Sequence, residues 1–259
     1  MNVRRIKIYG ERNTGTNFVE DLLAANLPLT ICAGNLPSPI RKMYKLAYKV
    51  LPYDIAYRLV EDDRDRRYAQ RFAAELGWKH ARIPNGPEGQ AYPDDVGFIA
   101  LMKDPYAWLL SLHKRPYQSK LNNHLHRISF SEFLRAPWRT VGREHGPAEY
   151  PNPVELWNDK VSSYAQLAEH GPAMLVRYEE VIEDINGFVH RVAESFGSEL
   201  PTQVSVPTKS TKNDGRSTAD IVAFYKDRSW VSKLCATDIE FINSQLDHDL
   251  ARRCGYQVI

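Results

Sequence analysis

Cysteine is scarce in this chain and long apolar runs are missing. The 259 residues include three cysteines, Cys32, Cys235 and Cys254. Their odd number and wide spacing give neither a disulfide framework nor a metal-binding pattern, so we expect a reducing compartment and no metal site. No apolar run is long enough to span a bilayer, and no signal peptide precedes the first predicted strand. We therefore expect a cytoplasmic protein without an integral membrane segment.

A charge excess of either sign is also missing. The chain has 34 Lys and Arg residues and 32 Asp and Glu residues, which gives a net charge of +2. This balance argues against nucleic acid as a partner, but it permits a local basic pocket. The hydrophobic content of 43% is ordinary for a globular protein, and the length suits one domain with a sizeable core.

Apolar strand patterns alternate with helical patterns along the chain. Strands are predicted at 4–9, 98–102 and 173–176, and helices at 17–25, 105–113, 153–169, 183–196 and 238–253. The continuous apolar run at 98–102 predicts a strand buried on both faces of a parallel sheet, and the strand at 173–176 is also expected to be buried. Residues 40–76 are predicted to be helical in two pieces that separate near Pro52. Residues 27–39, 77–97, 114–128 and 137–152 are predicted to be loops or irregular, and 198–217 a polar linker. This order predicts an α/β, P-loop-type layered fold with a central, mostly parallel sheet flanked by helices.

The most informative segment is 6–23, IKIYGERNTGTNFVEDLL. A strand runs into Gly10, a loop follows to Gly15, and an amphipathic helix begins there. This order aims backbone N–H groups and the positive end of a helix at one point, which favours phosphate or sulfate. The glycine spacing is that of a P-loop, but Thr16 and Asn17 replace the Lys and Ser/Thr that bind nucleoside triphosphates. The segment predicts an anion cradle, with a ligand-free tight turn as the alternative.

A second anion site is predicted after the strand at 98–102. Lys103 ends this strand, and Ser111 lies eight positions later in the next helix. Open α/β sheets bind ligands at the carboxyl ends of their strands, where a Lys and a hydroxyl can hold a second phosphate. Two further residues draw attention: His80 in the irregular segment GWKHARIP, and Tyr178 after the strand in LVRYEEVIED.

Together these segments resemble the sulfotransferases that use 3′-phosphoadenosine 5′-phosphosulfate (PAPS), above all bacterial-type members with a G-E-R-N-x-G-T-N opening. The resemblance covers most of the chain, including the final helix followed by Gly255-Tyr256. It implies that Lys103 and Ser111 bind the 3′-phosphate, that Tyr178 lies near the adenine and that His80 is the general base. It also implies that the 5′-phosphosulfate loop consists of Gly10, Glu11, Arg12, Asn13, Thr14, Gly15, Thr16 and Asn17.

The chain departs from the family at one position in this loop. Many members have a Lys two positions before the Gly-Thr pair, where it touches the bridging oxygen, and this chain has Asn13 there. We infer that the neighbouring Arg12 takes the cationic role, because its guanidinium stays charged and can bind two oxygens. The alternative is that Arg12 points away and the site is weak or inactive. Glu11 is a rival to His80 as the base.

The resemblance implies in-line transfer of a sulfuryl group from PAPS to a hydroxyl or amine, with release of 3′-phosphoadenosine 5′-phosphate (PAP) and no metal. The acceptor is expected to be a small molecule, a glycan or a lipid, bound within a single domain (1–259) by variable lid segments at 27–76 and 115–152. Late basic residues that are candidates to close on the 3′-phosphate are Lys209, Lys212 and Arg216. Two alternatives remain. One is a kinase with Asp104 as a magnesium ligand; the other is an inactive nucleotide-binding module.

Overall fold

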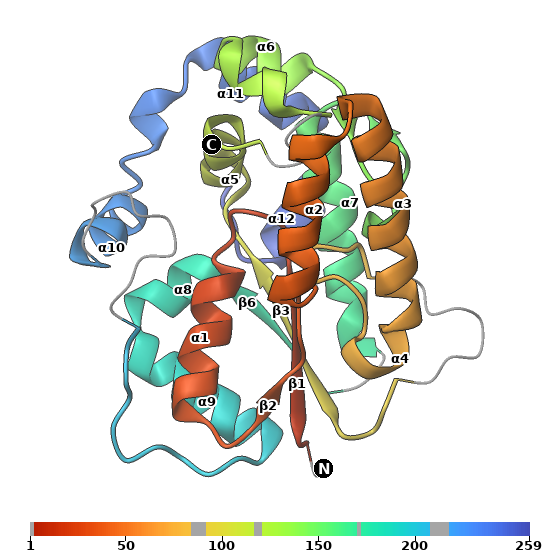
Figure 1. The fold of residues 1–259 in the computed structure, drawn as a ribbon. Helices are drawn as coiled ribbons and strands as arrows, with labels where there is room; N and C mark the ends of the chain where they lie inside the picture. Colours follow the sequence, from red (N-terminus) through yellow and green to blue (C-terminus); the bar gives the residue numbers. More distant parts are fainter. Residues whose placement is uncertain (1–2, 84–91, 117–120, 170–171, 208–217) are drawn as a thin grey trace.

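The centre of the protein is a four-stranded parallel sheet. We describe it from a computed structural model, which covers residues 3–83, 92–116, 121–169, 172–207 and 218–259. The strand order is β2-β1-β3-β6, with β1 at Arg5–Gly10, β2 at Thr30–Ile31, β3 at Val96–Met102 and β6 at Ala173–Arg177. Helices pack on both sides of this sheet (Figure 1), so the predicted α/β class is confirmed.

Each face of the sheet has its own apolar core. On one face, Ile6 and Ile8 of β1 pack with α1 (Thr16–Asn26) and α9 (Ile185–Phe196). On the other, Tyr9 and Phe98 pack with α5 (Pro105–Lys114) and α7 (Pro153–Ala165). Every residue of β3 is buried, because this strand lies between two others and is covered on both faces. The continuous apolar run at 98–102 had predicted such a strand.

The strand order places a topological switch point between β1 and β3. After β1 the chain passes through α1 to β2 on one side, and β3 then pairs with β1 on the other. In the parallel register Gly10 pairs with Leu101, and Met102 pairs with Arg177. The segments that follow β1, β3 and β6 therefore leave the sheet at the same edge, where open α/β sheets bind ligands.

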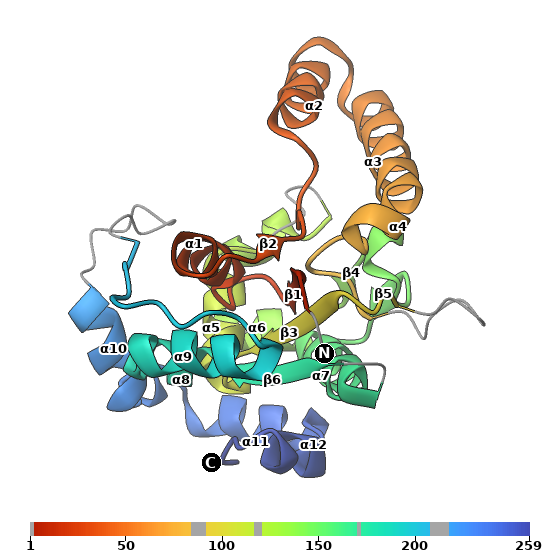
Figure 2. The same cartoon turned by 90° about the horizontal axis from the view of Figure 1, so that it is seen from below.

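A helical hairpin extends away from this sheet. It consists of α2 (Ser38–Val50) and α3 (Tyr53–Gln70), followed by the short α4 (Phe72–Glu75), as the pattern of residues 40–76 and the break near Pro52 predicted. Figure 2 shows the hairpin standing above the layered body. A separate apolar cluster lies beneath it, formed by Leu36, Tyr44, Val60, Tyr68, Trp78 and Val141.

The remaining elements complete the two layers. A small antiparallel pair is formed by β4 (Trp138–Arg139) and β5 (Glu149–Tyr150). The other helices are α6 (Phe130–Arg135), α8 (Tyr178–Glu183), α10 (Thr218–Lys226), α11 (Ala236–Gln245) and α12 (His248–Arg253). Short 3₁₀ turns lie at Asn123–Arg127, Gly142–Glu144, Gln166–Glu169 and Val231–Lys233. In the described ranges no helix is both long and apolar enough to cross a membrane.

Several local predictions were wrong. The segments at 27–39 and 137–152 contain β2 and the β4–β5 pair, although both were predicted to be loops. The predicted helix at 238–253 is two helices, because Asp247 accepts the Leu250 N–H at 2.8 Å and starts a new one. Strand β6 was expected to be buried, but it is an edge strand and the Leu175 side chain is 41% exposed.

The helix predicted at 183–196 begins two residues late. Asp184 caps α9 by accepting the Gly187 N–H at 2.8 Å, and the shorter helix α8 precedes it. The C-terminal end is as expected, because Gly197 follows the helix with φ 67°, a left-handed conformation that glycine adopts readily.

Candidate functional site

The loop between β1 and α1 is shaped by two left-handed residues, Asn13 (φ 66°) and Gly15 (φ 87°). Asn tolerates this conformation better than most residues, so it suits this position of the loop. The Thr14 hydroxyl and N–H both donate to the Glu11 carbonyl, at 2.5 and 3.3 Å, and fix the turn. Gly15 is the N-cap of α1 and has no side chain, so the first-turn N–H groups at this edge suit an anion.

Tyr178 lies directly against this loop. It is the first residue of α8, immediately after β6, and a Cβ atom on Gly15 would come within 2.4 Å of its Cε2 atom. Only glycine therefore fits between the loop and the tyrosine ring. The Lys103 Nζ lies 5.8 Å from the centre of the same ring and 4.7 Å from that of Tyr225. Tyr178 thus connects the loop after β1 with the Lys after β3.

Lys103 and Ser111 are in direct contact. The Lys103 Nζ donates to the Ser111 Oγ at 2.8 Å, and that hydroxyl donates to the Ala107 carbonyl one turn earlier at 2.9 Å. The Lys103 side chain is almost fully buried, and its backbone carbonyl accepts the Trp157 indole N–H at 3.1 Å. The two residues that the spacing singled out therefore form one polar unit beside the switch point.

The His80 side chain is attached to the first residue of the loop. Its Nδ1 lies 2.6 Å from the Gly10 carbonyl oxygen, and because a carbonyl can only accept, Nδ1 carries the proton. The lone pair is therefore on Nε2. Burial lowers the pKa of His80 well below its usual value, and the nearby charges of Arg12 and Lys79 lower this pKa further. The ring is neutral at pH 7, with Nε2 able to accept a proton.

Arg12 lies beside His80 and is not directed away from the site. Its guanidinium stacks over the Trp78 ring at 4.6 Å, and its backbone carbonyl accepts the Trp108 indole N–H at 2.8 Å. Arg12 and His80 line the same pocket. The side chain that we expected to replace the missing loop Lys is therefore in position to meet an anion there.

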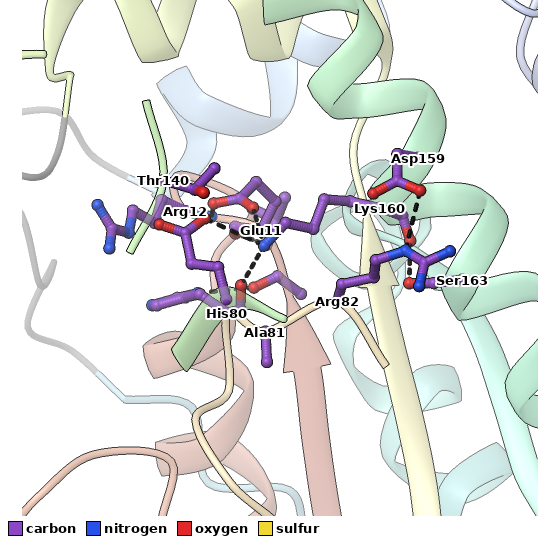
Figure 3. Close-up of polar contacts among 12 residues, drawn as sticks. Glu11, Arg12, His80, Ala81, Arg82, Thr140, Asp159, Lys160 and Ser163 are labelled. Carbon is purple, nitrogen blue, oxygen red and sulfur yellow. Dashed lines mark hydrogen bonds and ion pairs between the residues drawn. The ribbon is translucent and has the colours of Figure 1, made fainter. Parts of the chain in front are cut away.

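Glu11 is directed to a different neighbour. One carboxylate oxygen accepts the Arg12 N–H at 2.7 Å, and the other lies 3.2 Å from the Nζ of Lys160 (Figure 3). Lys160 also lies 3.2 Å from the carboxylate of Glu144 and donates to the His80 carbonyl at 2.6 Å. Glu11 is absent from the pocket lining, so this geometry favours an anchoring role for it and leaves His80 facing the pocket.

Sequence reasoning missed Lys160 and Lys79. Lys160 is fully buried in α7, where Trp157, Val161 and Tyr164 form an apolar stripe, and a Lys within such a stripe was the available signal. Lys79 is nearly as buried. Its Nζ donates to the Asn17 side chain and pairs with Glu20 at 2.6 Å.

Lys79 also joins its segment to the loop through the backbone, because its carbonyl accepts the Gly10 N–H at 3.0 Å. On the opposite side of the loop, the Asn13 side-chain amide donates to the Arg115 carbonyl at 3.4 Å. The side chains of Asn13 and Asn17 are therefore both in contact with neighbouring segments, and they help to hold the loop in place. Thr16, the first residue of α1, is buried.

A pocket of about 360 Å³ opens in front of Arg12 and His80. The remaining lining residues are Asn35, Leu36, Arg41, Arg64, Tyr68, Trp78, Pro116 and Arg143. They come from both segments that the sequence assigned to acceptor binding, 27–76 and 115–152, and from the turn that holds His80. Among the described residues that line the pocket, four are arginine and none is acidic.

Asp104 has a structural role after β3. Its carboxylate caps α5 by accepting the Ala107 N–H at 3.0 Å, and burial raises its pKa to about 7. Its backbone N–H donates to Glu179 at 3.0 Å. Across the described ranges, no three His, Cys, Asp or Glu side chains gather as a metal site. Residues Lys209, Lys212 and Arg216 lie outside the described ranges.

Comparison with known proteins gives distant likenesses among solved structures. No protein family model and no curated protein matches the chain. Among solved structures, the sulfotransferase domain from the curacin biosynthetic pathway has a TM-score of 0.47 and 14% sequence identity, and the match covers 100% of this chain and 99% of that one. Retinol dehydratase in complex with androsterone and the inactive cofactor PAP has a TM-score of 0.37 and 12% identity over 98% and 79% of the two chains. Similarity at this level leaves the activity of this chain open.

Proposed function

We propose that this protein is a PAPS-dependent sulfotransferase that transfers a sulfuryl group to an acceptor hydroxyl or amine. One observation carries the proposal: two features that suit anions lie next to each other at the switch point of the sheet. They are the loop that enters α1 and the Lys103–Ser111 pair. PAPS has two anionic groups on one nucleoside, and it therefore suits a pair of neighbouring anion sites.

The residues fit this donor in a specific arrangement. The loop Gly10–Asn17 and the start of α1 would hold the 5′-phosphosulfate, because first-turn N–H groups favour anions. Lys103 and Ser111 would bind the 3′-phosphate through one charge-assisted and one neutral hydrogen bond. Tyr178, against Gly15, would lie beside the adenine.

His80 serves as the general base in this proposal. Its Nε2 accepts the proton of the attacking hydroxyl, and its Nδ1–H keeps its hydrogen bond to the Gly10 carbonyl. That carbonyl stabilises the positive ring as it forms and fixes its orientation, as a triad carboxylate does for its histidine. A positioned base typically contributes about 10²–10⁴-fold to the rate. When PAPS is bound, it supplies the sulfuryl group and departs as PAP.

Arg12 stabilises the leaving group in this proposal. Its position over Trp78 keeps a permanent positive charge beside His80. A fixed cation lowers the barrier when negative charge grows on the oxygen that leaves. The same charge helps to keep His80 unprotonated before the reaction, because it lowers the pKa of the ring.

Thermal unfolding with added nucleotides tests the donor assignment. PAP without metal should raise the melting temperature, because a ligand at a hundred times its Kd adds about 2.7 kcal/mol to stability. ATP with magnesium should stabilise the protein less. If ATP with magnesium stabilises it equally or more, the kinase alternative with Asp104 is favoured. If PAP binds but PAPS is never turned over, the chain is an inactive nucleotide-binding module.

Two substitutions separate the roles of base and donor cation. His80→Gln should lower turnover and leave PAP affinity nearly unchanged, because a base acts in the transition state. Arg12→Ala should lower both turnover and PAP affinity, and Arg12→Lys should restore part of each. Turnover is followed as PAPS consumption, by water if no acceptor is at hand. Full activity in His80→Gln combined with none in Glu11→Gln would make Glu11 the base.

A further inference from the structure

The pocket in front of His80 has an excess of positive charge. Its arginines are Arg12, Arg41, Arg64 and Arg143. Two carboxylates form ion pairs with these arginines. Glu61 pairs with Arg64 and Arg143 at 2.7 Å each, and Asp65 pairs with Arg143 at 2.8 Å. Among the described residues that line this pocket, four are arginine and none is acidic.

Two of these arginines are held rigidly. Arg143 is 5% exposed and stacks over Trp78 at 4.8 Å, on the ring that also contacts Arg12. Arg64 stacks over Tyr44 at 4.9 Å. Their charges are therefore fixed before any ligand arrives, which removes much of the entropic cost of binding an anion.

Arg41 is different, because it is exposed and forms no ion pair with any described residue. It lies in the first turn of α2, where the positive end of the helix dipole disfavours a cation. Within α2 this location is unfavourable for stability, and an anion bound in the adjoining pocket would offset that cost.

We propose that the acceptor carries an anionic group, bound by Arg41, Arg64 and Arg143, which places a neighbouring hydroxyl at the Nε2 of His80. This inference rests on the proposed function and specifies its acceptor class. The acceptor oxygen loses its proton to Nε2 and forms a bond to sulfur. The bond from sulfur to the 5′-phosphate oxygen breaks, and its electron pair leaves with PAP.

Matched phenyl compounds test the preference for an anion. With the protein saturated with PAP, isothermal titration compares phenyl β-D-glucuronide, phenyl phosphate and the neutral phenyl β-D-glucoside. At least one anionic probe should bind ten or more times more tightly than the glucoside, and the preferred probe tells a carboxylate from a phosphate. If no anionic probe binds, or if the glucoside binds equally well, the proposal is overturned.

A matched pair of variants on α2 locates the contact. Arg41→Gln should weaken the preferred anionic probe at least tenfold and leave PAP affinity unchanged. Lys42→Gln removes an exposed charge from the next position, which does not line the pocket, and should change neither affinity. An equal loss in both variants, or no loss in Arg41→Gln, would refute the assignment. If the wild-type protein fails to bind PAP, the proposed function fails, and the same titrations without PAP still test the anion site.

Discussion

Replacing Lys160 by Met should destabilise the protein more than almost any other polar substitution. The Lys160 side chain is fully buried and contacts Glu11 and Glu144 at 3.2 Å each, and it donates to the His80 carbonyl at 2.6 Å. Met keeps the helix propensity and approximate volume but removes the cation that contacts two buried carboxylates. Breaking a buried ion pair from one side costs about 3–5 kcal/mol. We expect the free energy of unfolding to fall by that amount, which is a large share of a typical 5–15 kcal/mol.

Urea denaturation followed by fluorescence of the five tryptophans measures this loss. With a slope of about 3 kcal/mol per molar urea, the midpoint should drop by roughly 1–1.7 M. Lys42→Met, which changes an exposed residue of α2, should stay within about 0.5 kcal/mol of wild type. If Lys160→Met lowers the free energy of unfolding by less than about 1 kcal/mol, the Lys160 charge does not stabilise the two buried carboxylates as argued.

A compensating variant examines the cause. Adding Glu11→Gln and Glu144→Gln to Lys160→Met removes both buried carboxylate charges, so the triple variant should be more stable than Lys160→Met alone. If the triple variant is no more stable, the loss in the single variant comes from packing and not from unpaired charge.

Three further predictions concern the loop and its neighbours. Because the pKa of His80 is lowered, kcat/KM should stay level from pH 8 down through 6.5 and fall only below pH 6.5. The unfolding free energy should decline below about pH 6.5, because the unfolded histidine then takes a proton that the folded one resists. A rate profile that already halves at pH 6.5 would contradict this. Gly15→Ala should lower the unfolding free energy measured by urea denaturation by about 1–3 kcal/mol, because of the positive φ at this position and overlap with the Tyr178 ring. Adding Tyr178→Ala should restore the part of this loss that is due to overlap but not the part that is due to φ. Lys103→Ala and Ser111→Ala should weaken PAP binding by about 1.5–3 kcal/mol and 0.5–1.5 kcal/mol respectively. Titrations with adenosine 5′-phosphosulfate, which lacks the 3′-phosphate, should show little change in affinity. Equal losses for both ligands would refute the assignment of these residues to the 3′-phosphate.

The sequence predicted the sheet edge better than the surroundings of the site. The loop at Gly10–Asn17 and the Lys103–Ser111 pair depend on local order and on the direction of parallel strands, and both can be read from one sequence. The separation of 238–253 into two helices depends on a single capping Asp247, which outweighs a continuous helical pattern. The exposure of β6 follows from the strand order, which the local pattern does not contain.

The partners of His80 and the wall of the pocket depend on distant contacts. Lys160 lies 80 positions from His80, and Arg143 is held by residues of α3 that lie 78 and 82 positions earlier. No local sequence motif predicts such pairs, since each depends on how the hairpin and α7 pack around the loop. The lid segments at 27–76 and 115–152 were predicted only as variable regions, and the arginines within them were not singled out.

The separate apolar cluster beneath α2 and α3 has a consequence for local stability. Six buried apolar side chains outside the two cores of the sheet hold this hairpin, together with the ion pairs from Arg143 to Glu61 and Asp65. Opening it exposes little of those cores, so amide hydrogens of α2 and α3 should exchange with solvent at a lower free energy than those of β1 and β3. The hairpin that contributes Arg41 and Arg64 should therefore open as a cooperative unit of its own, and chimeric proteins with a different hairpin should keep the sheet folded.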